Sequence, residues 1–263
     1  MPFNLIDTDC SDLVIDYGYE IVDKDLLAEY VGELVLGHYL HILNIINSLS
    51  SSSSTPSNKI IDFAIEKLNV TGDVNVIHRD GWLFQMISWL VLAHRNSGSN
   101  YHTQHPHFAP AQHGIDGLSI VLNPDNSIDK IIITEDKCTI KPRDTVREQV
   151  FPEFKDFEDG KKDSALISVL SSLIAHLDAG AVFQSVQNDI YNTDLRMYRI
   201  GITREETHQS LKGRRRLFKN YDDYVSGPIS SRRSAATIYL DDMRSWMQDF
   251  SDSVIDYLES KKS

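Results

Sequence analysis

The sequence predicts a mixed α/β fold in which helices flank a small sheet. Two strand-like segments, at 114–122 and 128–137, enclose NPDNS (123–127), whose Pro, Asp and Asn residues are typical of a turn. Segments with apolar residues at helical spacing precede and follow this hairpin, and LRMYRIGIT (195–203) is expected to form a further strand. Because helical and strand-like segments are interspersed, we expect the helices to pack around the sheet.

The helical segments follow from the spacing of apolar residues. They are expected at 25–49, 59–68, 79–95, 143–158 and 162–178, and in a C-terminal helix with Met243, Trp246, Met247, Phe250, Val254 and Tyr257 on one face. Asp80 is placed to cap the N-terminus of the helix at 79–95. Residues 1–22 are expected to be irregular, and residues 74–78 to form a short strand.

The chain of 263 residues is long enough to bury a real core, and its composition divides it into three regions. The N-terminal region, 1–78, is expected to be helical and contains a flexible serine-rich loop at 48–58. The core, 79–203, holds the hairpin. The last region, 204–263, is a basic segment followed by the C-terminal helix.

Charge and cysteine content limit the classes of function. The net charge of −12 means that the overall field of the protein repels nucleic acid, so DNA binding would need a local basic surface or a partner. Cys10 and Cys138 provide no disulfide framework and suit a reducing cytoplasm. We expect no signal peptide and no membrane association, since the longest apolar stretch, 82–93, is too short to span a bilayer.

The hairpin brings together side chains that suit metal-dependent chemistry. Side chains alternate along a strand, so Glu135 and Lys137 emerge on the same face, beyond the apolar Ile131 and Ile133. Asp116 begins the preceding strand, and antiparallel pairing around the turn is expected to place it beside Glu135. Two carboxylates suit Mg²⁺ or Mn²⁺, and Lys137 would orient the attacking water at a phosphodiester.

The residues Gly114-Ile115-Asp116 and Glu135-Asp136-Lys137 resemble the motif of the PD-(D/E)xK nuclease superfamily. The helix–hairpin–helix–strand order over 79–203 is similar to the core of that superfamily. More narrowly, the chain length, the N-terminal helix with GEL and the EDK hairpin resemble the HamA family of nuclease subunits from Hachiman anti-phage defence systems.

This resemblance implies a restriction-endonuclease-like core and a Mg²⁺- or Mn²⁺-dependent deoxyribonuclease activity. Asp116 and Glu135 would bind the ion, the backbone carbonyl of Asp136 would assist, and Lys137 would complete the catalytic set. The resemblance further implies a role in antiviral defence, with a HamB-like helicase subunit that binds DNA and controls the nuclease. The acidic net charge agrees with DNA delivery by such a partner.

The sequence departs from the superfamily pattern at the helix before the hairpin, which usually carries a metal-binding glutamate. This helix offers Gln85, whereas Glu33 lies on an earlier predicted helix. Either residue is a possible third ligand, and we favour Gln85 because it is closer in sequence. The missing glutamate also supports an alternative, in which the chain is a non-catalytic helicase-binding subunit on a degenerate nuclease fold.

Two further clusters have a functional and a structural interpretation. The loop at 96–113 and its flanks contain five histidines: His94, His102, His105, His107 and His113. A polar loop beside the site is favoured over a zinc site because the spacing of these histidines matches no familiar zinc pattern. Basic residues that are either DNA contacts or parts of solvated helix faces are Arg143, Arg147, Lys212, Arg214, Arg215, Arg216 and Lys219.

Overall fold

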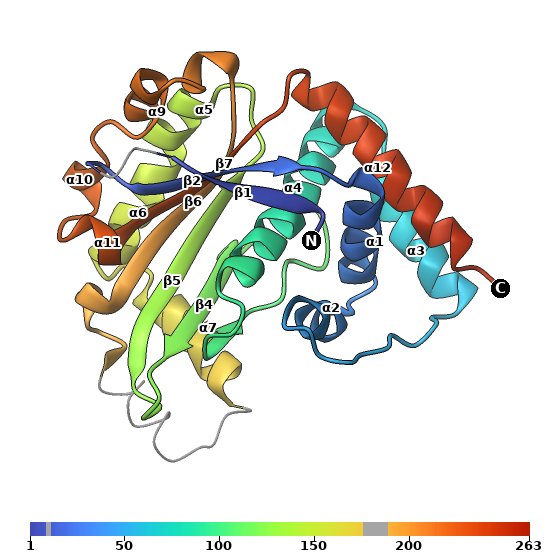
Figure 1. Cartoon of the computed structure of the whole chain (residues 1–263), viewed down its shortest axis with the longest axis horizontal. Coiled ribbons are helices and arrows are strands. Elements are labelled where there is room, and N and C mark those ends of the chain that lie inside the picture. Colours follow the sequence, from blue (N-terminus) through green and yellow to red (C-terminus); the bar gives the residue numbers. More distant parts are fainter. Residues whose placement is uncertain (9–11, 176–188) are drawn as a thin grey trace.

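The structure is a computed structural model that describes residues 1–8, 12–175 and 189–263. Within these residues a seven-stranded mixed sheet has helices on both faces (Figure 1). Its strand order is β1-β2-β7-β6-β5-β4-β3. The strands are β1 (Phe3–Asp7), β2 (Ile15–Ile21), β3 (Tyr101–Thr103), β4 (Gly117–Leu122), β5 (Ile128–Lys137), β6 (Arg196–Arg204) and β7 (Arg233–Tyr239).

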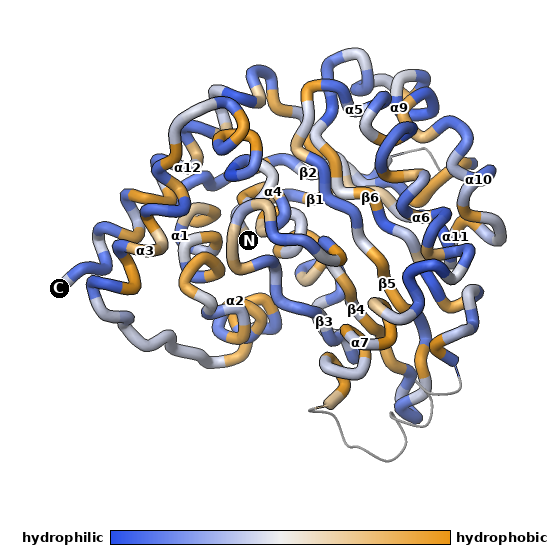
Figure 2. Tube along the Cα trace, turned by 180° about the vertical axis from the view of Figure 1, so that it is seen from behind, coloured by the Kyte–Doolittle hydropathy of each residue, from blue (hydrophilic) through white to orange (hydrophobic). Residues whose placement is uncertain are grey.

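The middle of the sheet is parallel and its edges are antiparallel. Strands β5, β6, β7 and β2 run parallel to one another, whereas β4 pairs antiparallel with β5 and β1 with β2. Strand β5 is apolar along its centre, as Figure 2 also shows, which agrees with burial on both faces. The carboxyl ends of β5, β6 and β7 therefore lie at one edge of the sheet, and polar side chains emerge there.

One face of the sheet packs against the N- and C-terminal helices. Apolar side chains from these helices and from β1, β2 and β7 form one core cluster. Helices α1, α3 and α12 contact one another although α12 is far from the others in sequence (Figure 1). The helices are α1 (Lys24–Val35), α2 (Tyr39–Ile46), α3 (Asn58–Leu68), α4 (Asp73–Arg95) and α12 (Met243–Ser260).

The other face carries the helices that follow the hairpin, and a second apolar cluster lies between them and β4, β5 and β6. Pro152 lies at the start of α6, directly after a π-helical turn, η1. These elements are α5 (Pro142–Thr145), η1 (Val146–Val150), α6 (Phe151–Glu158) and α7 (Asp163–Ile174). Shorter elements follow: η2 (Thr193–Leu195), η3 (Glu206–His208), α9 (Leu211–Leu217), α10 (Tyr221–Tyr224) and α11 (Ile229–Arg232).

The predicted mixed α/β class, with helices packed around a sheet, and the predicted hairpin are confirmed, and several local predictions are wrong. The helix expected at 25–49 is two helices, because the chain turns at Gly37 with a φ of +87°. Residues 74–78 belong to α4, which begins seven residues before Asp80, so Asp80 is not its cap. Residues 1–22, expected to be irregular, contain β1 and β2. The end of the helix predicted at 162–178 extends beyond the described residues.

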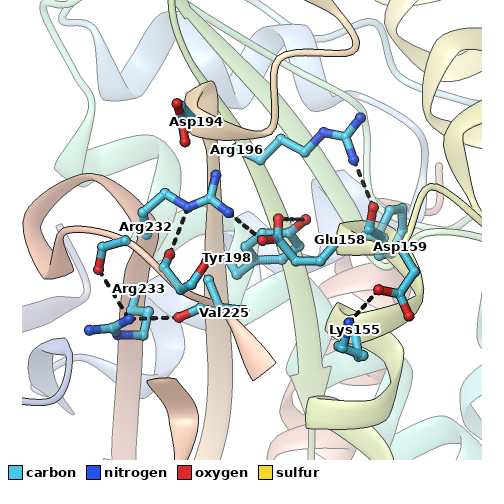
Figure 3. Close-up of polar contacts among 12 residues, drawn as sticks. Lys155, Glu158, Asp159, Asp194, Arg196, Tyr198, Val225, Arg232 and Arg233 are labelled. Atoms are coloured by element: carbon cyan, nitrogen blue, oxygen red, sulfur yellow. Dashed lines mark hydrogen bonds and ion pairs between the residues drawn. The ribbon is translucent and has the colours of Figure 1, made fainter. Parts of the chain in front are cut away.

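The amino ends of β6 and β7 are held together by arginines (Figure 3). Arg196 and Arg233 begin these strands, and their guanidinium groups donate to main-chain carbonyls, including that of Phe157 at 2.7 Å for Arg196. Arg232 donates to Glu158 at 2.6 Å, and the Tyr198 hydroxyl donates to the same carboxylate at 2.8 Å. This end of the sheet is thus fixed by contacts between buried cations and oxygen atoms of the chain itself.

Among the described residues, no helix is both long enough and apolar enough to cross a membrane.

Candidate functional site

The β4–β5 hairpin brings three of the predicted residues together. Gly117 pairs with Thr134, so Asp116 lies opposite Glu135 where the two strands meet the edge of the sheet. The Lys137 ammonium lies 2.9 Å from the Glu135 carboxylate and 3.6 Å from that of Asp116. The Asp136 main-chain N–H donates to Asp116 at 3.0 Å, which fixes the Asp116 carboxylate against β5.

Burial and charge oppose each other at this cluster. Glu135 is 5% exposed, and burial together with the nearby Asp116 carboxylate raises its pKa to about 8, although Lys137 acts in the opposite direction. Burial alone would lower the pKa of Lys137, but Glu135 and Asp116 raise it above its ordinary value. The ammonium therefore stays charged, and two acidic side chains share it.

Asp136 points to the opposite face of β5, as strand alternation requires. Its carboxylate accepts from the Ser88 hydroxyl of α4 at 2.5 Å and lies 3.6 Å from Arg199 of β6. Burial raises the pKa of Asp136 to about 7, and Arg199 opposes that shift. A Cβ on Gly201 would lie 2.0 Å from Asp136 Oδ1, so glycine at this position gives the carboxylate its space. These contacts fix the carboxyl end of β5 on the face opposite Glu135 and Lys137.

Gln85 lies at the site and holds its backbone. Its amide Nε2 donates to the Asp116 carbonyl at 2.6 Å, and its Oε1 accepts from the His107 main-chain N–H at 3.3 Å. The side chain therefore links α4 to both the hairpin and the preceding loop. Gln85 therefore positions Asp116, whether or not Gln85 itself binds a metal ion.

Glu33, the other residue considered as a third ligand, lies elsewhere. Its carboxylate contacts His38, Tyr257 and Lys261, so it joins α1 to α12. None of these residues lines the pocket that contains Asp116 and Lys137. The structure does not bring Glu33 to the cluster.

A pocket of about 370 Å³ opens at the cluster, and both faces of the sheet edge contribute to it. Its walls include Asp116, Lys137, Gln85 and His107. Arg244, at the start of α12, lies on the same wall and was not recognised from the sequence.

Asp80 fixes the position of the Arg244 side chain. Its Nη1 donates at 2.5 Å to Asp80, a fully buried residue of α4 that also accepts from Arg79. The two arginines come from helices far apart in sequence, and Asp80 joins them. A cation is thereby fixed at the rim of the pocket, where it can meet an anionic ligand.

The predicted DNA-contact residues occupy two neighbouring surfaces. Arg143, Arg147 and Lys219 line one pocket of about 350 Å³. Arg143 donates to the carbonyls of Leu217 and Lys219, whereas Arg147 pairs with Asp144 and Glu148. The remaining basic residues lie on α9, namely Lys212, Arg214, Arg215 and Arg216. Arg215 is ion-paired with Asp12 at 3.2 Å.

The histidines do not converge. His94 packs against Phe3, His105 against Phe108, and His102 bonds with Asn100. Among the residues that the structure describes, no three His, Cys, Asp or Glu side chains form a group able to hold a metal ion. A zinc site in this loop is therefore not supported, and Mg²⁺ or Mn²⁺ at Asp116 and Glu135 would rely on few protein ligands, as those ions commonly do.

No family model matches this chain, and no curated protein matches it. We therefore infer the function from the site itself.

Proposed function

We propose that this protein is a Mg²⁺- or Mn²⁺-dependent deoxyribonuclease of the PD-(D/E)xK type, built on a restriction-endonuclease-like core. The observation that supports this most directly is the meeting of Asp116 and Glu135 at one ammonium, that of Lys137. The residue types, their order in the chain and their convergence at the end of a hairpin agree with the superfamily motif.

The cluster fits a small divalent cation. Asp116 and Glu135 provide two acidic oxygen-bearing groups, and within the described residues Lys137 is the cation in contact with both. Burial and the nearby Asp116 carboxylate raise the pKa of Glu135, and a bound cation would lower it again. Such ions prefer carboxylate and carbonyl oxygens as ligands, and the main-chain carbonyl of Asp136 would be one of them. A bound ion would polarise the phosphodiester and lower the pKa of a water.

Side chains of the protein would then orient the attacking water and bind the substrate. Lys137 carries a fixed positive charge beside both carboxylates, so it would orient the attacking water and stabilise the charge that develops on the phosphate. Gln85 would hold Asp116 in place through the main-chain carbonyl of Asp116, and Arg244 would bind the substrate strand at the rim of the pocket. Each of these groups already has its orientation set by the surrounding elements.

The biological setting that we propose is anti-phage defence, with this chain as a HamA-like effector controlled by a helicase subunit. The support is the motif resemblance and the net charge of −12, which disfavours unassisted DNA binding. In this proposal the helicase partner supplies DNA and restrains cleavage until it is needed.

The second candidate is a non-catalytic subunit that docks on a helicase. The observation in its favour is that α4 places Gln85, a neutral residue, where the superfamily usually has a metal-binding glutamate. A weakened ion site would follow if two carboxylates and a carbonyl were insufficient. Metal-dependent cleavage distinguishes the two proposals.

The test is cleavage of supercoiled and linear DNA by the purified chain, alone and with a helicase partner, in Mg²⁺, in Mn²⁺ and in EDTA. We expect cleavage that EDTA abolishes and that the double variant Glu135→Ala, Lys137→Ala lacks. The matched control is Asp129→Ala, Lys130→Ala, which removes an exposed ion pair from the same strand at its other end. Cleavage that persists in EDTA or in the first double variant would exclude the proposed mechanism.

A further inference from the structure

Arg204 is a buried cation for which the described part of the chain provides no hydrogen-bond acceptor. It ends β6, is 9% exposed, and its Nε and Nη1 atoms lie out of contact with solvent. No hydrogen bond or ion pair joins its guanidinium to any of the described residues, and both buried N–H groups lack a partner. Because an unpaired buried charge is costly, such a group indicates a ligand that supplies the acceptor.

Two neighbouring residues each have one buried nitrogen atom that finds no hydrogen-bond partner among the described residues. In Arg214 of α9 this atom is Nε, although the side chain forms an ion pair with Asp16 at 3.8 Å. In His208, which is 2% exposed, this atom is Nε2. Burial lowers the pKa of Arg204, and the positive charge of Arg214 lowers it further. A Cβ on Gly18 of β2 would lie 3.7 Å from Arg204 Nη2, and Asp16, the ion-pair partner of Arg214, precedes Gly18 by two residues on the same face of β2, so both guanidinium groups lie beside this strand.

The buried part of this cluster and the exposed lining of its pocket differ in charge. Asp16 is the carboxylate that opposes the two arginines; its oxygens also accept from Thr8 and Thr237, and burial raises its pKa. Acidic residues at the mouth of the pocket are exposed: Glu205, Glu206, Asp241 and Asp242. The buried part of the cluster thus carries two fixed positive charges against one carboxylate.

This cluster adjoins the carboxylate site. Arg204 lines a pocket of about 340 Å³ that shares Thr139 and Arg244 with the pocket containing Asp116 and Lys137. Lys137 pairs with Ile202, so Arg204 lies two residues farther along the neighbouring strand, about 7 Å at the usual rise. A nucleic acid strand at the first pocket would therefore pass Arg244 and reach Arg204.

We propose that Arg204 and Arg214 form a phosphate subsite, which binds a phosphate of the substrate strand next to the scissile one. This inference rests on the proposed nuclease function and extends it. Guanidinium groups present paired N–H donors that match phosphate oxygens, and the unpaired N–H groups described above supply such donors.

The position of Arg214 depends on a close helix contact. A Cβ on Gly213 would lie 2.1 Å from the Thr207 carbonyl oxygen and 2.8 Å from His208 Cα. Helix α9 therefore packs directly on η3, and glycine is the residue that allows this approach. Moving α9 outward would separate Arg214 from Arg204.

The test is binding of a short fluorescent single-stranded oligonucleotide in EDTA, where cleavage does not interfere. We expect Arg204→Gln to weaken binding about tenfold and to reduce its salt dependence, and Arg204→Lys, which keeps the charge, to weaken binding less. The control is Lys161→Gln, which removes the same charge from an exposed residue paired with Asp156 and should bind as the wild type does. If Arg204→Gln does not fold, Arg204→Lys decides.

Cleavage kinetics separate this proposal from the proposed nuclease function. With an active enzyme, Arg204→Gln should raise KM about tenfold with a smaller change in kcat. A chain that cuts no DNA but binds the oligonucleotide through Arg204 would reject the nuclease function and retain the subsite. Binding and KM values of the folded Arg204 variants equal to those of Lys161→Gln would overturn the subsite, whether or not the chain cuts DNA.

Discussion

Glu33 and Glu135 are both buried, at 2% and 5% exposure, yet their surroundings differ. Glu33 accepts from His38 and Tyr257, each at 2.6 Å, and from Lys261. Although burial would raise the pKa of Glu33, these hydrogen bonds lower it to about 2. The carboxylate is thus fully supplied with donors from two helices.

The Glu135 carboxylate has fewer hydrogen-bond donors around it than the Glu33 carboxylate has. Its ammonium partner, Lys137, also faces Asp116, and burial with this second carboxylate raises the pKa of Glu135 to about 8. If Glu135 is functional, as we propose, burial alone does not distinguish it from the structural Glu33. The number of donors and cations per carboxylate does, and a shortage of them marks a place where a metal ion fits.

The largest expected effect is on cleavage. Glu135→Gln keeps the size of the side chain but removes the charge that would bind the ion, so kcat/KM should fall at least about 100-fold. Glu33→Gln should leave cleavage near the wild-type value at temperatures where it is folded. Rates measured under saturating Mn²⁺ would contradict the comparison if the two variants were equally impaired.

Stability should respond in the opposite order. Glu33→Gln leaves Lys261 without its carboxylate, so the free energy of unfolding at pH 7 should fall by about 2 kcal/mol. Glu135→Gln in EDTA should change it by less than about 0.5 kcal/mol or increase it, because a poorly compensated acid is removed. Urea titrations of both variants measure this. A Glu135 variant that loses more stability than the Glu33 variant would show that Glu135 is structural.

The hairpin part of the site was predictable because it is local. The turn at 123–127 sets the register of two adjacent strands, and that register places Asp116 opposite Glu135. The contacts of Glu33 were not predictable, since Tyr257 and Lys261 are more than 200 residues away in sequence. The same holds for Ser88 and Asp136, which meet only when α4 packs on the sheet.

Strand β7 escaped prediction for a different reason. Its centre, Ala235 and Ala236, is fully buried, but alanine favours helices and gives no strand signal. Its first residue, Arg233, is buried through contacts with carbonyls of distant segments. The first four residues of β7 are charged or small, and only Thr237, Ile238 and Tyr239 favour a strand. The strand is therefore stabilised mainly by its neighbours in the sheet, which local sequence patterns do not record.

The contribution of Glu33 should depend on pH. Its pKa in the folded protein, about 2, lies below its ordinary value of 4.5, so the stabilisation is present above pH 4.5 and is lost as the pH falls toward 2. The difference in unfolding free energy between wild type and Glu33→Gln should therefore shrink from about 2 kcal/mol at pH 7 toward zero near pH 2. A difference that stays constant between pH 7 and pH 3 would show that the carboxylate is not the source of the stabilisation.

The smallest expected effect concerns the cation that does not neutralise the site. Arg244 lines the pocket, yet its guanidinium donates to Asp80 at 2.5 Å, so the Asp116 and Glu135 carboxylates keep their shortage of positive charge. If Arg244 instead serves the substrate, Arg244→Gln should raise KM about fivefold and change kcat little, since one charge-assisted contact to a phosphate is lost. Arg244→Lys should recover part of that loss. A fall in kcat with unchanged KM would place Arg244 in the chemical step, and the separation between a cation-poor catalytic cluster and a cationic rim would have to be abandoned.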